Sequence, residues 1–145
     1  MRYSARITTF FDKLAKKVKD SNNQALNKTC ALIRKEAIEK MRRRPGAARA
    51  GFPPHNHVKP GLKAIAYDIQ GEQGFIGPLK FRGSKFFNRP VPNIHEFGGI
   101  AVGVSFGRSS VARYPERSFM YSAVKNLQRK NKLASQFTIT FRSNF

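Results

Sequence analysis

The chain has 145 residues, and its 28 lysines and arginines against 8 aspartates and glutamates give a formal net charge of +20. This length suits one domain, residues 1–145, with a core that needs no disulfides. The charge predicts a polyanionic partner, such as nucleic acid, an acidic protein or anionic lipid, and the charges in the first twenty residues argue against a secretory signal or a membrane-spanning helix.

The N-terminal third has the pattern of an amphipathic helix. Apolar residues recur at steps of three and four from Ile7 to Met41, and the opposite face is mostly lysine and arginine. Cap-type residues at 20–23 interrupt the pattern without changing its phase, which predicts two helices or one bent helix. The second helix is expected from about Asn22 to Arg43, before Pro45.

The middle of the chain predicts a linker and a hairpin. Residues 45–60 are rich in proline and small residues and lack a period, so an extended loop within the domain is expected. From Leu62 onward, side chains alternate in character, and residues 71–74 make a plausible turn into a second strand that ends at Phe81.

Residues 80–92 form a predicted basic loop with four cations and three phenylalanines. Cations hold phosphates while aromatic rings stack on bases, but phenylalanines in a loop equally often anchor into a core or a neighbouring subunit. The arginine run at 42–44 is most simply a solvated helix end, with phosphate contact as the alternative. The candidate DNA or partner contacts are Arg42, Arg43, Arg44, Lys80, Arg82, Lys85 and Arg89.

The C-terminal third predicts a strand, a helix and a strand. Residues 100–106 are an apolar run between glycines, residues 118–133 return to helical spacing, and residues 137–141 alternate as a strand does. The expected fold is therefore α+β, with N-terminal helices and a C-terminal helix packed on one face of a mostly antiparallel sheet.

Catalytic and metal-binding patterns are weak. The letters at 55–57 spell His-Asn-His, but nuclease chemistry needs a base and metal ligands spread over a ββα unit. Zinc needs three or four converging ligands, and the chain has three histidines and one cysteine, Cys30, which falls on the apolar helix face and is predicted to be buried. No phosphate-binding glycine motif or catalytic carboxylate pair is present. We therefore expect no enzyme activity, metal or cofactor.

Only two acidic residues follow Glu72, and twelve cations surround them. We expect Glu96 to form a bidentate pair with Arg117 or Arg113. Phe97 and Phe119 would be buried beside this pair, and the adjacent glycines would allow a tight turn.

Glu116 is expected in the first turn of the final helix, where its charge would complement the helix dipole. The predicted motif residues around the two acids are Glu96, Phe97, Gly98, Gly99, Arg113, Pro115, Arg117 and Phe119.

Four short motifs occur in a defined order. They are G-F-P-P at 51–54, G-L-K at 61–63, E-F-G at 96–98 and P-E-R-S-F at 115–119, with Ala123 following. In this order and spacing they resemble the tail-completion and neck proteins of long-tailed bacteriophages, also described as minor tail or virion-morphogenesis proteins. Ser118 departs from the pattern, because the family commonly has proline there.

The resemblance implies a structural protein of the virion neck or tail, made in the bacterial host cytoplasm. Such a protein would form a tail-completion or tail-terminator ring that joins tail to head around the DNA channel, with a hexamer favoured over a dodecamer. Its partners would be its own copies, neighbouring neck, connector or tail-tube proteins, and DNA bound without sequence specificity, with no membrane.

Two other classes fit the charge. A small non-specific nucleic-acid-binding protein of ribosomal or chromatin type has a similar size and basicity, although no RNA- or DNA-reading motif is present. A membrane-surface protein would use the basic amphipathic stretch at 7–18, but an N-terminal core helix gives the same pattern more often.

Overall fold

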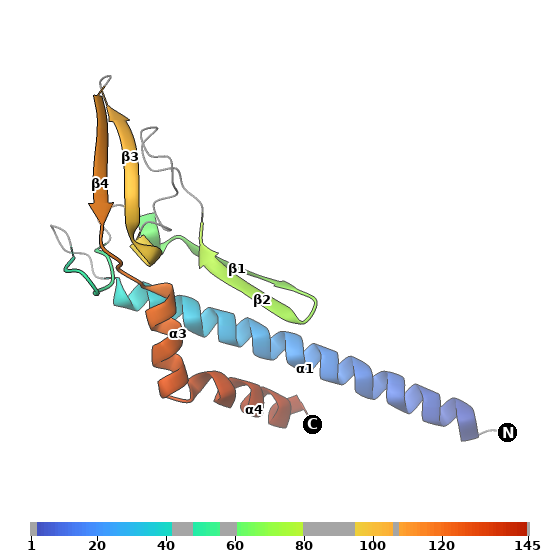
Figure 1. Ribbon diagram of the computed structural model, residues 1–145. Coiled ribbons are helices and arrows are strands. Elements are labelled where there is room, and N and C mark those ends of the chain that lie inside the picture. The colour runs from blue at the N-terminus through green and yellow to red at the C-terminus, as the bar shows by residue number, and fades with distance from the viewer. Residues whose placement is uncertain (1–2, 42–47, 56–60, 80–94, 106–107, 145) are drawn as a thin grey trace.

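The computed structural model describes residues 3–41, 48–55, 61–79, 95–105 and 108–144. Its longest element is helix α1, Tyr3–Lys40, which runs along one side of the molecule (Figure 1). At 1.5 Å per residue, its 38 residues span about 57 Å. The predicted interruption at 20–23 is absent. Ser21 is buried and its Oγ accepts a hydrogen bond from Asn144 Nδ2 at 3.0 Å, so tertiary packing outweighs the local preference of cap residues to end a helix.

The predicted first hairpin is confirmed, although its second strand begins at Gln73, within the expected turn, and ends at Pro78. Strands β1 (Ile65–Gln70) and β2 (Gln73–Pro78) pair antiparallel, and the short 3-10 helix η1 (Gly61–Lys63) precedes them. The two-residue turn contains Gly71, whose φ of 61° is favourable for glycine. The hairpin lies along α1, where Arg34 Nε donates a hydrogen bond to the carbonyl oxygen of Ile65 at 2.7 Å.

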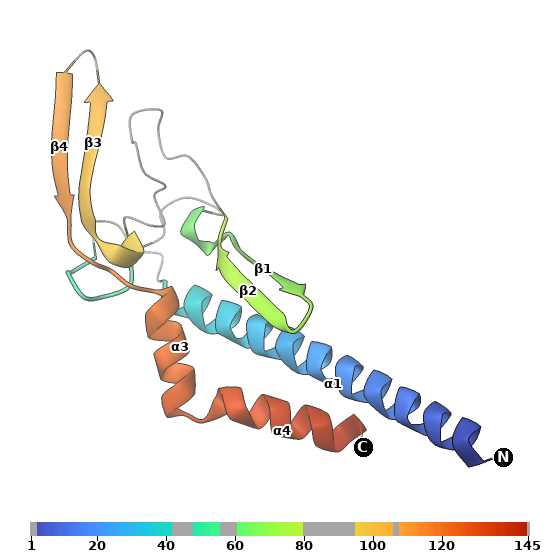
Figure 2. The same cartoon turned by 45° about the vertical axis from the view of Figure 1, so that its right-hand side comes forward.

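A second hairpin follows. Strand β3 (Gly99–Ser105) confirms the predicted strand at 100–106, and it pairs antiparallel with β4 (Arg108–Tyr114), which the sequence pattern did not predict. The two hairpins are separate two-stranded sheets. Figures 1 and 2 show that β3–β4 projects away from the helices.

Two helices close the described chain: α3 (Met120–Arg129) and α4 (Lys132–Asn144), joined at Asn131, whose φ is 53°. The predicted strand at 137–141 is wrong. Thr140 is completely buried and accepts a hydrogen bond from Lys28 Nζ at 3.4 Å. Thr140 and Asn144, four residues apart, both bond to side chains of α1, as residues on one helix face do, and this period prevails over the short alternation of phenylalanine and threonine.

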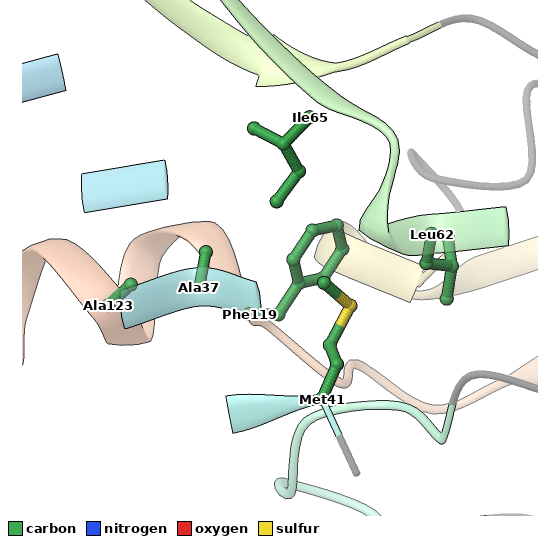
Figure 3. Close-up of a cluster of buried hydrophobic side chains, with 6 residues drawn as sticks. All are labelled: Ala37, Met41, Leu62, Ile65, Phe119 and Ala123. Atoms are coloured by element: carbon green, nitrogen blue, oxygen red, sulfur yellow. The ribbon is translucent and has the colours of Figure 1, made fainter. Parts of the chain in front are cut away.

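The core lies where α1, η1, β1 and α3 meet. Figure 3 shows the Phe119 ring between the side chains of Ile65 and Met41. This arrangement confirms the α+β class, with helices contacting small antiparallel sheets. The buried members of the cluster are Ala37, Met41, Leu62, Ile65, Phe119 and Ala123.

Farther along α1, Cys30 is buried as predicted, and burial raises the pKa of its thiol. Its Sγ lies close to β2: a Cβ built on Gly74 would be 2.7 Å from that sulfur. A glycine at this position therefore allows the hairpin to lie against α1.

Candidate functional site: the motif junction

The side chain of Glu96 reaches the N-terminal end of helix α3. Residues 95–97 form a helical turn before β3. From this turn, Oε1 of Glu96 accepts hydrogen bonds from Ser118 Oγ at 2.9 Å and from the Tyr121 amide at 2.8 Å. Oε2 accepts hydrogen bonds from the amides of Phe119 at 3.0 Å and Met120 at 3.1 Å. Both carboxylate oxygens are thus engaged with the start of one helix.

Helix α3 needs such a partner because the first amides of a helix have no acceptor within the helix. The residue at its N-cap position is Phe119, whose side chain has no oxygen, and no acidic residue lies in its first turn. Glu96 supplies the acceptor from 23 residues earlier in the chain. Its negative charge also interacts favourably with the positive end of the helix dipole.

The predicted pairing of Glu96 with an arginine is replaced by this cap. Arg117 directs its Nε to the carbonyl oxygen of Ala48 at 2.9 Å, and its amide donates to the carbonyl oxygen of His95 at 2.8 Å. Arg113 is exposed on β4, opposite Ile100. Within the ranges that the structure describes, no ion pair joins Glu96 to either arginine.

The predicted tight turn after Glu96 is confirmed. Gly98 has φ 65° and Gly99 has φ 121°, backbone angles that residues with a side chain rarely adopt. A Cβ on Gly98 would lie 2.8 Å from the backbone nitrogen of Glu116 and 3.0 Å from the carbonyl oxygen of Tyr114. The two stretches therefore touch backbone to backbone, which leaves no room for a side chain.

Two expectations about neighbouring residues are wrong. Phe97 is 77% exposed rather than buried, because the turn at 95–97 points it away from the core, whereas Phe119 is buried as expected. Glu116 and Pro115 lie before α3, which begins only at Met120, so Glu116 cannot act in its first turn. The Glu116 side chain is exposed, and its backbone carbonyl accepts a hydrogen bond from the amide of Gly51 at 3.1 Å.

All four motifs of the sequence converge here. Gly51 bonds to the backbone of Glu116, Pro54 is fully buried, and Leu62 belongs to the same core cluster as Phe119. The E-F-G motif adds the Glu96 cap. We call the segments at 51–54, 61–63, 95–98 and 114–119 the motif junction.

His95 is the titratable neighbour of Glu96 in the motif junction. Its Nδ1 is buried and has no hydrogen-bond partner. Burial lowers the pKa of His95, and the nearby Arg117 cation lowers it further. Both effects favour the neutral form of the imidazole, and the backbone carbonyl of His95 accepts a hydrogen bond from the Arg117 amide.

Sequence reasoning missed the part played by Ser118 and by the helix amides. Ser118 stands where the resemblance would favour proline, and its hydroxyl donates to the Glu96 carboxylate. The sequence offered Ser118 itself as a cap-type residue for this helix, and the structure shows that the helix begins only at Met120, with Phe119 at the N-cap position.

The candidate DNA or partner contacts at 42–44, 80, 82, 85 and 89 lie outside the described residues. In the part of the chain that the structure describes, no three histidine, cysteine or acidic side chains are grouped as metal ligands would be. Nor does any helix there have the length and apolar character needed to cross a membrane. Comparison of the chain with protein-family models, curated proteins and solved structures found no match.

Proposed function

We propose that this protein is a structural component of the neck of a long-tailed bacteriophage, a tail-completion or tail-terminator ring that joins tail to head around the DNA channel. The observation that supports this proposal is the convergence of four motifs at the motif junction. They are separated by up to 64 positions, from residue 51 to residue 115, yet they share backbone contacts, a helix cap and a core cluster. The residues that carry the resemblance thus form one structural unit.

The chemistry of the junction suits a structural role. The Glu96 carboxylate accepts four hydrogen bonds from the start of α3, so it is occupied as a cap. His95 beside it is partly buried, and its ring nitrogen Nδ1 has no partner through which a proton could be relayed. The cap holds the base of the β3–β4 hairpin at the start of α3.

The charge of +20 supports assembly with other molecules around DNA. Phosphate attraction needs no base reading, so a positively charged ring can surround DNA of any sequence. Like charges oppose contact between free copies, and acidic partner rings or DNA would relieve that repulsion. The isolated protein is therefore expected to assemble less readily than the protein in a particle.

Deletion of the gene from the phage or prophage that carries it tests the proposal. Electron microscopy of the lysate should show separate heads and tails, or tails with abnormal ends, and a plasmid copy of the wild-type gene should restore joined virions. Normal infectious particles after deletion, or purified virions that lack the protein, would refute a neck function.

The alternative is a small non-specific nucleic-acid-binding protein of ribosomal or chromatin type, which the same charge favours. Fractionation of infected or induced cells separates the two classes. A neck protein should sediment with virions and tails, whereas the alternative requires most of the protein to sediment with ribosomes or the nucleoid.

A further inference from the structure

The N-terminal half of α1 extends beyond the end of helix α4, which packs against the middle of α1. Asn144, the last residue of α4, donates hydrogen bonds to Ser21 Oγ at 3.0 Å and to Gln24 Oε1 at 3.2 Å. Residues 3–20 lie beyond this point and correspond to about 27 Å of helix. Every side chain from 10 to 20 is exposed, and Figure 1 shows this end of α1 projecting past α4.

An apolar stripe runs along this overhang in phase with the face that α4 covers. Ala25 and Ser21 are buried, and Val18, Leu14 and Phe11 continue the same face at steps of three and four. Val18 is 44% exposed, Leu14 36% and Phe11 60%. Phe10 packs edge-to-face against Phe11, with 5.9 Å between ring centroids. The helix–helix contact surface thus continues as an exposed apolar stripe, which we call the helix stripe: Phe10, Phe11, Leu14 and Val18.

A second apolar surface lies on the β3–β4 hairpin. Val102 pairs with Val111 and Ile100 pairs with Arg113, so these side chains share one face of the hairpin. Ile100 is 54% exposed, Val102 41% and Val111 69%. A two-stranded hairpin without a covering layer is only marginally stable. We call Ile100, Val102 and Val111 the hairpin face.

We propose that the helix stripe of one copy docks on the hairpin face of a second copy, head to tail. The overhang and the hairpin lie at opposite ends of the molecule (Figures 1 and 2). One copy therefore leaves one surface of each kind free for its neighbours. A repeated contact between two different surfaces builds a ring when the rotation closes, and in that respect the inference rests on the proposed ring function.

Charge favours the hairpin face over a second helix stripe as the counterpart. Antiparallel pairing of two overhangs would bring their lysines together, which is unfavourable. Of the two residues paired with Ile100 and Val102, one is a cation, Arg113, and the other is Val111. By comparison, the overhang from 10 to 20 carries two acidic and four basic residues: Asp12, Asp20, Lys13, Lys16, Lys17 and Lys19.

Salt dependence distinguishes this contact from binding to a polyanion. Two copies with a charge of +20 repel each other, and raising ionic strength shortens the screening length from about 10 Å at 0.1 M to about 3 Å at 1 M. Apolar docking between copies should therefore strengthen with salt. Binding to nucleic acid or to an acidic protein should weaken.

Complementation between two variants tests the head-to-tail arrangement. Phe11→Gln with Leu14→Gln disables the helix stripe, and Val102→Thr with Val111→Thr disables the hairpin face with residues suited to strands. Analytical ultracentrifugation at about 1 M salt should show oligomers of the wild-type protein, monomers of each variant alone, and a one-to-one heterodimer in the mixture. The heterodimer forms because each variant supplies the surface that the other lacks.

A matched control changes the other side of the overhang. Asp12→Gln with Lys16→Gln leaves the net charge unchanged and should assemble like the wild-type protein. Circular dichroism verifies that each variant is folded.

If a double variant does not fold, the single changes Leu14→Gln and Val111→Thr replace the two double variants in the mixing experiment.

Several outcomes would overturn the inference. A wild-type protein that stays monomeric at every salt concentration, while it binds polyglutamate or DNA, would show that the surfaces serve another partner. Dimers of the hairpin variant alone would indicate symmetric helix-to-helix docking. These outcomes are separate from failure of the neck function, since normal virions after gene deletion would refute that function without affecting the contact measured in solution.

Discussion

The carboxylate of Glu96 accepts a hydrogen bond from the amide of Phe119 at 3.0 Å, and the Phe119 side chain is completely buried in the core. Phe119 thus links two parts of the molecule: its backbone holds the turn before β3, and its ring packs beside Met41 and Ile65 (Figure 3). The base of the β3–β4 hairpin is consequently fixed to the start of α3.

Replacement of Glu96 by alanine should lower the free energy of unfolding by about 2 to 4 kcal/mol. Loss of a helix cap costs about 1 kcal/mol, and amides left without an acceptor in a partly buried place add about 1 to 3 kcal/mol. Glu96→Gln should cost less, because its amide oxygen still accepts hydrogen bonds. Urea denaturation followed by circular dichroism measures the difference.

The matched control is Glu116→Ala, at the other acid of the same basic half. Its side chain is exposed and only its backbone carbonyl makes the bond to Gly51. The change should alter stability by no more than about 0.5 kcal/mol. Equal losses for the two variants would mean that the cap is not the reason for the effect of Glu96.

Local patterns predicted much of the fold but not this cap. The β1–β2 hairpin, the glycine turn after Phe97 and the burial of Phe119 all follow from short-range signals, namely alternation, turn residues and helical spacing. The Glu96 carboxylate meets amides 23 to 25 positions later. The excess of cations suggested arginine as the partner of Glu96. A count of charges does not include the backbone amides at a helix start, so it could not identify them as the partners.

Tertiary contacts also explain the misassigned elements. The alternation at 137–141 fits a strand as well as a helix, and the contacts of Thr140 and Asn144 with α1 select the helix. Similarly, Ser21 sits within α1 because its hydroxyl is paired with Asn144. Strand β4 was missed because its sequence, RSSVARY, has little apolar alternation, and pairing with β3 defines it.

Gly74→Ala should destabilise the protein by about 1 to 3 kcal/mol, because the new Cβ would lie 2.7 Å from Cys30 Sγ and either the strand or the cysteine side chain would have to shift. Cys30→Ala removes that sulfur, so the double variant should lose less stability than the sum of the single changes. The coupling should be at least about 0.5 kcal/mol. Urea denaturation of the four proteins gives the cycle.

Gly77→Ala is the control on the same strand, since a Cβ there meets nothing within 4 Å. It should change stability by less than about 0.5 kcal/mol. Additive effects of Gly74→Ala and Cys30→Ala would show that the strand does not approach the helix at the sulfur.

Stability should fall as the pH drops below the ordinary histidine pKa of 6.5, because burial and Arg117 lower the pKa of His95 in the folded protein. The unfolded chain then takes up the proton at a higher pH than the folded one, so protonation favours unfolding. Well above pH 6.5, His95 is neutral in both the folded and the unfolded protein, so its titration does not reduce the stability there. In His95→Asn the decline of the melting temperature between about pH 6.5 and 5 should be shallower than in the wild type; identical slopes would contradict a lowered pKa.

Any affinity of the isolated protein for DNA should be non-specific and depend steeply on salt. The logarithm of the binding constant should fall by about 0.9 per neutralised phosphate for each decade of salt concentration. Fluorescence anisotropy with two duplexes of unrelated sequence measures both properties. Binding that persists in high salt, or that strongly prefers one duplex, would argue for base reading.

Amide hydrogen exchange at the start of α3 tests the Glu96 cap most directly. The amides of Phe119, Met120 and Tyr121 donate to the Glu96 carboxylate, so NMR should find them protected in the wild-type protein and in Glu116→Ala. In Glu96→Ala these three amides should exchange much faster relative to the interior amides of α3. Unchanged relative protection in Glu96→Ala would contradict the claim that Glu96 joins the two motifs.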